Sequence, residues 1–158
     1  MDVDGGTRTL AYVASAVGVG FASGIVPFVN IEVYVTYLGV TAPHPLRPLL
    51  LVVATVAHML GKSVLYLAGR EADRLPIGSF QRRVERARAK IAGRPSLGAV
   101  TIAVSAAAGF PPFYFVTVAS GVVRYRFVHF FLIGLAGRLV RFAVLLAAPG
   151  WLGHGGEP

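Results

Sequence analysis

Apolar residues gather into long runs that are separated by short polar or proline-containing breaks. Two of these runs, 49–69 and 127–148, are uninterrupted by proline. As helices rising roughly 1.5 Å per residue, each would span a hydrocarbon core of about 30 Å. We therefore predict a transmembrane helix over each range.

Two further segments are apolar but broken by proline. The segment 8–43 is interrupted at Pro27, and the segment 96–123 is interrupted at Pro111 and Pro112. A proline inside a helix removes a backbone donor, and the pieces that follow these prolines are too short to cross the core. We predict that each segment is a re-entrant helical hairpin with its proline at the tip.

A basic connection, 70–95, separates the two halves of the chain. Eight of the 15 Lys and Arg residues fall between Arg70 and Arg94. Apolar residues recur within the connection at helical spacing, which predicts an amphipathic helix; they are Phe80, Val84, Ala87 and Ile91. Such a helix can lie on anionic lipid headgroups or be solvated, and both interpretations stay open.

The two halves follow the same plan, a broken hairpin and then a long helix. Gly61-Lys62 in the first long helix aligns with Gly137-Arg138 in the second. Inverted repeats with broken helices are a recurring transporter plan. The predicted fold is an all-α integral membrane protein, one domain over 1–158. It is an inverted repeat of two re-entrant hairpins, each followed by a transmembrane helix.

The distribution of cations predicts the orientation in the membrane. With the basic connection inside and only the two long helices crossing, ten cations lie inside and two, Arg8 and Arg47, lie outside. This satisfies the positive-inside rule. We expect a multi-pass protein of the plasma (cytoplasmic) membrane with both termini outside.

Composition narrows the functional classes. The chain is 55% hydrophobic and 14% charged, whereas soluble domains carry about 25% charged residues. It has no cysteine, which excludes a disulfide framework and cysteine-ligated zinc. The net charge of +8 could suggest nucleic acid. We expect no nucleic-acid partner, because the charge is concentrated between membrane segments.

Four charged residues lie inside the apolar segments, away from their ends: Glu32, Lys62, Arg138 and Arg141. A charge in the middle of a membrane costs about 2.5–3.5 kcal/mol on insertion scales, so such residues usually line a pathway or meet a partner. We expect Glu32 either to carry a proton or to pair with one of the three cations. The excess of positive charge predicts an anion, and arginine suits phosphate. A lipid phosphate and a soluble anion both remain open.

His58, Lys62 and Tyr66 recur every four residues and therefore share one helix face. We expect this face to look inward. His58 could shuttle protons, or it could be a hydrogen-bonded packing residue. No catalytic, cofactor or metal-ligand constellation accompanies these residues, so we expect no enzyme, cofactor or metal.

Several segments in order resemble the DedA family, the bacterial branch of the VTT-domain or "SNARE-associated" membrane proteins. They are the hairpin 24–32, the span 57–70, the hairpin 110–121, and then Phe127, Gly137 and Arg141. The likeness covers roughly 22–142 and is nearest to the short, YqaA-like branch. Glu32 matches the acidic hairpin residue of the family, and Arg138 and Arg141 match its basic positions. Many members also carry arginines around the second hairpin's proline, where this chain has none.

The resemblance implies two facing re-entrant hairpins and a role in lipid transport. Family members are implicated in recycling a polyprenyl-phosphate carrier, and eukaryotic relatives in scrambling phospholipids. We therefore expect a transporter or scramblase of a phosphate-bearing lipid. The alternatives are a proton-coupled transporter of a small solute or ion, and a structural membrane protein that transports nothing. The expected partners are membrane lipids, and a homo-oligomer is left open.

Overall fold

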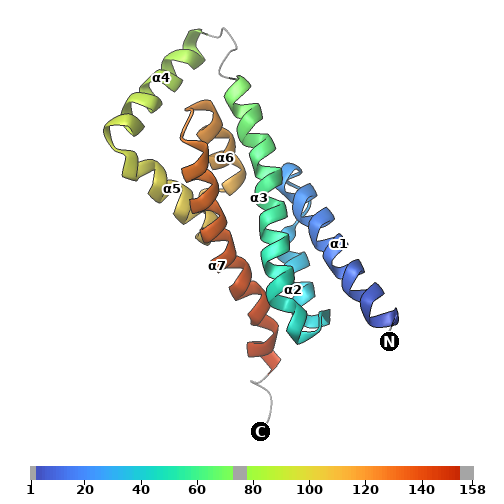
Figure 1. The fold of residues 1–158 in the computed structure, drawn as a ribbon. Coiled ribbons are helices and arrows are strands. Elements are labelled where there is room, and N and C mark those ends of the chain that lie inside the picture. The colour runs from blue at the N-terminus through green and yellow to red at the C-terminus, as the bar shows by residue number, and fades with distance from the viewer. Residues whose placement is uncertain (1–2, 73–77, 154–158) are drawn as a thin grey trace. The chain divides into compact units, whose positions relative to one another are not determined.

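The described part of the chain is built from helices alone. The computed structural model describes residues 3–72 and 78–153 (Figure 1), and no strand occurs among them. The prediction of an all-α fold is confirmed. The helices are α1 (Val3–Ile25), α2 (Ile31–Thr41), the 3-10 turn η1 (His44–Leu46), α3 (Arg47–Ala72), α4 (Gly78–Gly93), α5 (Pro95–Ala108), α6 (Phe113–Val122) and α7 (Phe127–Gly153).

In the described part of the chain, three helices are long and apolar enough to cross a membrane, which indicates a multi-pass membrane protein. The candidate spans are Gly5–Ile25, His44–Ala72 and Phe127–Pro149. The last two contain the predicted spans 49–69 and 127–148. The first candidate span was not among the predicted transmembrane helices. Helix α1 begins at Val3, ahead of residue 8 where the hairpin was expected to start, and it is therefore long enough to cross a membrane. A fourth candidate exists if α4 and α5, bent by 101°, count as one broken span.

The helices are distributed over two compact units. The first unit combines Met1–Gly61 with Leu139–Pro158, and the second is Lys62–Arg138. The first unit therefore holds the pair α1–α2, the first part of α3 and the last part of α7. The second holds the rest of α3, then α4, the pair α5–α6 and the first part of α7.

In the first unit, the chain breaks where the sequence predicts it. Helix α1 ends at Ile25, two residues before Pro27, because a residue that precedes proline is disfavoured in the helical conformation. Helix α2 is then restarted by Asn30. Its side-chain oxygen accepts hydrogen bonds from the backbone N–H groups of Glu32 and Val33, at 2.9 and 3.3 Å.

The second unit breaks at the predicted prolines too. Helix α5 ends at Ala108 and is capped by Gly109, whose φ of 82° is the left-handed conformation that glycine adopts readily. Pro111 and Pro112 follow, and α6 begins at Phe113. The three prolines thus lie between helices, while their depth in the membrane stays a prediction.

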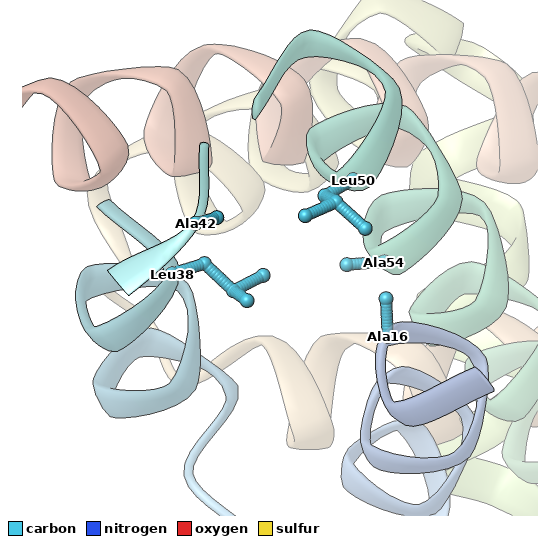
Figure 2. Close-up of a cluster of buried hydrophobic side chains, with 5 residues drawn as sticks. All are labelled: Ala16, Leu38, Ala42, Leu50 and Ala54. Atoms are coloured by element: carbon cyan, nitrogen blue, oxygen red, sulfur yellow. The ribbon is translucent and has the colours of Figure 1, made fainter. Parts of the chain in front are cut away.

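Small side chains bring the helices of the first unit close together. Figure 2 shows Ala16 of α1 and Leu38 of α2 beside Leu50 and Ala54 of α3, all at most 1% exposed. Farther along α1, a Cβ atom on Gly24 would overlap the backbone of α3 at His58 and Gly61. Close backbone approach at small residues is typical of membrane helices, and it brings Ser23 of α1 against α3.

Candidate functional site

Glu32 forms an ion pair with Arg141 inside the first unit. The Nε atom of Arg141, on α7, donates a hydrogen bond of 2.7 Å to Oε1 of Glu32. The Arg141 side chain is 24% exposed and that of Glu32 is 34% exposed. Glu32 also lies in the first turn of α2, where the helix dipole favours a negative charge. Of the two alternatives expected for this acid, the structure shows pairing, with Arg141, and the pair ties α2 to α7.

His58 lies in a buried hydrogen-bond chain of the same unit. Its Nδ1 atom is 2.9 Å from the hydroxyl of Ser23, and that hydroxyl donates a 2.7 Å hydrogen bond to the carbonyl of Gly20. Because a serine has only one hydroxyl proton, Nδ1–H of His58 must be the donor to Ser23. The imidazole also meets the ring of Phe142 edge to face at 5.8 Å. These contacts favour the packing interpretation of His58.

Lys62 and Arg138 are buried cations of the second unit. Lys62 is 4% exposed and Arg138 is 7% exposed. Each lies over an aromatic ring from the start of α6. The Nζ atom of Lys62 is 5.1 Å from the ring centroid of Tyr114, and Cζ of Arg138 is 4.7 Å from that of Phe113. Both distances fit cation–π contacts.

An aromatic stack holds this cation pair in place. The Phe113 ring is parallel to that of Phe130 on α7 at 6.1 Å, and Phe130 stacks on Tyr66 of α3 at 5.2 Å. The Tyr66 hydroxyl donates a hydrogen bond to the carbonyl of Tyr125. Tyr66 is therefore buried, as the shared face with His58 and Lys62 predicts, and it orders the surroundings of the two cations.

Phe113 and Tyr114 are the members of the site that sequence reasoning missed. They directly follow Pro111-Pro112. The sequence signal for them is two adjacent aromatic residues at the start of a helix, in a chain that also carries cations in its membrane segments. Spacing alone did not reveal their pairing with the cations, because Lys62 and Arg138 come from two other helices.

Helix α4 is amphipathic, as predicted for the basic connection. Val84 is 5% exposed, whereas Arg82, Arg83 and Arg86 are exposed. Arg88 donates a 2.9 Å hydrogen bond to the carbonyl of Val122, which fastens α4 to the end of α6. The apolar side of α4 therefore faces helices of its own unit. Residues 73–77 of the predicted connection lie outside the described part of the chain.

The two buried charged side chains described in the second unit, Lys62 and Arg138, are both cationic. Among the described residues, no three His, Cys, Asp or Glu side chains are grouped as a metal site. The second unit instead offers an ammonium and a guanidinium group beside aromatic rings, and both groups bind phosphate.

No protein-family model matches this chain, and neither the curated proteins nor the solved structures contain a significant match.

Proposed function

We propose that this protein moves a phosphate-bearing lipid across the bilayer, as a transporter or scramblase. The lipid would be a phospholipid or a polyprenyl-phosphate carrier, as the resemblance to DedA-like proteins implies. One observation carries the proposal: Lys62 and Arg138 are both buried in helices of membrane-spanning length, over the rings of two adjacent residues, Tyr114 and Phe113.

The energetics of this cation pair support a phosphate ligand. Removing an ammonium or guanidinium group from water is costly, and placing two such charges together adds repulsion. The aromatic faces of Phe113 and Tyr114 offset part of this cost. A phosphate between the two groups would offset more, because charge-assisted hydrogen bonds to its oxygens are short and strong. The surrounding rings would suit the hydrocarbon chain of the same lipid.

The ion pair of the first unit bears on the alternative of proton coupling. A proton-coupled carrier of a small solute or ion would need Glu32 to gain and lose a proton during transport. The 2.7 Å hydrogen bond from Arg141 instead gives Glu32 a structural task, holding α2 against α7. This observation favours lipid movement without a proton gradient.

The two units also support the proposed inverted repeat. In each unit, the second helix of the pair meets the last part of a long helix at a glycine. A Cβ atom on Gly39 of α2 would overlap the carbonyl of Leu146, and one on Gly121 of α6 would overlap the carbonyl of Tyr66. We propose that both units derive from one repeat, that their proline breaks are re-entrant tips, and that the protein resides in the cytoplasmic membrane.

The proposal is tested with purified protein in liposomes that contain a phospholipid with a fluorescent headgroup. A membrane-impermeant reductant bleaches only the outer leaflet of protein-free liposomes. If the protein scrambles lipid, the inner-leaflet label is also lost, without any ion gradient. Loss of label only under a proton gradient would favour a driven transporter. Unchanged inner-leaflet label under both conditions would favour a structural protein.

A further inference from the structure

We propose that the second unit has a separate lipid site, a pocket between α4, α5 and α6 that binds one acyl chain of an anionic phospholipid. The pocket has a volume of about 300 Å³. Its lining is apolar on all three helices and includes Ile91 of α4, Ile102 of α5 and Val116 of α6. This volume is at the low end of the range for ligand sites, which suits part of a single chain.

Two features fix the packing of the helices around the pocket. Gly98 on α5 has no side chain, and a Cβ atom there would be 2.7 Å from the ring of Tyr125 and 3.5 Å from Ile91. The hydrogen bond from Arg88 to Val122 holds α4 beside the end of α6. The space therefore belongs to the packing of the three helices and does not depend on one flexible side chain.

The bend between α4 and α5 indicates where the pocket lies in a membrane. The axes of the two helices differ by 101° at the break after Gly93. Helix α5 is apolar, whereas α4 carries five Lys and Arg residues and one acid, Glu85. If α5 enters the hydrocarbon, α4 lies along the surface at the level of the headgroups. The pocket under α4 then opens where acyl chains begin.

Charge identifies the lipid class. Lys90 lines the pocket and is exposed, and Arg94 is exposed at the junction with α5. A chain bound in the pocket would bring its headgroup beside these cations, which favours an anionic headgroup over a zwitterionic one. The site is distinct from Lys62 and Arg138 and does not depend on whether the protein transports lipid.

The experiment measures lipid retained by the full chain after extraction from vesicles of equal parts phosphatidylglycerol and phosphatidylcholine, by native mass spectrometry. The wild type should retain one phosphatidylglycerol. Ala87→Phe on α4 and Thr101→Phe on α5 each place a ring in the pocket. Either should lower retention about fivefold or more, since the ring takes the place of the chain. Having one filling variant from each helix keeps the test valid if one of them misfolds.

Lys90→Gln should lower the preference for phosphatidylglycerol about fivefold, the effect of roughly one cation near an anionic lipid. The matched control is Arg83→Gln, which removes the same charge from an exposed position of α4 outside the pocket. If Lys90→Gln and Arg83→Gln lower the preference for phosphatidylglycerol equally, the preference comes from general attraction between α4 and anionic lipids, and the proposal is overturned. Unchanged retention by a folded pocket-filling variant, or no preference in the wild type, would overturn it as well.

Discussion

Glu32 and Tyr114 occupy the same position in their helices, the second residue of α2 and of α6, and each contacts a basic side chain. Glu32 pairs with Arg141, whereas Tyr114 presents its ring to Lys62. A carboxylate neutralises its cation, while an aromatic face stabilises a cation and leaves its charge in place. This difference is why we propose phosphate binding for the second unit and a structural role for the ion pair of the first.

The Glu32–Arg141 pair should behave as one energetic unit. Because the pair is partly exposed, its coupling should lie between that of surface and buried pairs, about 1–3 kcal/mol. Unfolding in mixed micelles should show this in a cycle of Glu32→Gln, Arg141→Gln and the double variant. The double variant should be less destabilised than the sum of the singles. Strict additivity would show that the two side chains do not stabilise each other.

The ring of Tyr114, and not its hydroxyl, should stabilise Lys62. Tyr114→Phe keeps the aromatic face and should leave the free energy of unfolding within error of wild type. Tyr114→Leu removes the face and should lower it by about 0.5–2 kcal/mol. The same unfolding assay measures both. An equal loss in the two variants would instead assign the stabilisation to the hydroxyl.

The contact of α1 with α3 should depend on the absence of a side chain at Gly24. A Cβ atom there would overlap backbone that cannot move easily, so Gly24→Ala should destabilise the protein by about 1–3 kcal/mol. Gly18, also on α1, has open space around it. Gly18→Ala should therefore stabilise by about 0.5–1 kcal/mol through helix propensity. If the unfolding assay shows that both substitutions stabilise the protein, or that both destabilise it, the result would contradict this packing.

The predicted orientation can be tested directly because the chain has no cysteine. A cysteine in place of Arg86, exposed on α4, should react with a membrane-impermeant maleimide only in inside-out vesicles. A cysteine in place of His44, exposed in η1, should react in intact cells. Labelling of both positions from the same side would refute two crossings with α4 inside.

The helical breaks were predictable from sequence because they depend on local chemistry. Pro27, Asn30 and Pro111-Pro112 act through backbone geometry and capping, which require no knowledge of distant residues. The sequence limits the partner of Glu32 to three cations, Lys62, Arg138 and Arg141, but it does not indicate which of the three is the partner. The rings over Lys62 and Arg138 were missed because aromatic residues are common in membrane helices. Such contacts depend on which helices meet, and only the fold shows that.

The pocket between α4, α5 and α6 could not be predicted from the sequence either. The spacing of Val84, Ala87 and Ile91 predicts an amphipathic helix, and α4 is one. That spacing does not say whether the apolar side meets lipid or protein. In the structure, Val84 is buried while Ala87 and Ile91 line a pocket, so this side meets both helices and open space.

The scrambling rate of Lys62→Met and Arg138→Met in liposomes tests the central claim most directly. Replacing a buried cation by a hydrophobic residue should leave stability unchanged or raise it. If these cations bind the lipid phosphate, each variant should nevertheless scramble about tenfold more slowly or worse, since a charged hydrogen bond contributes about 1.5–3 kcal/mol. The matched control Arg126→Gln, at an exposed position, should scramble at the wild-type rate. Wild-type rates in both folded methionine variants would contradict the account.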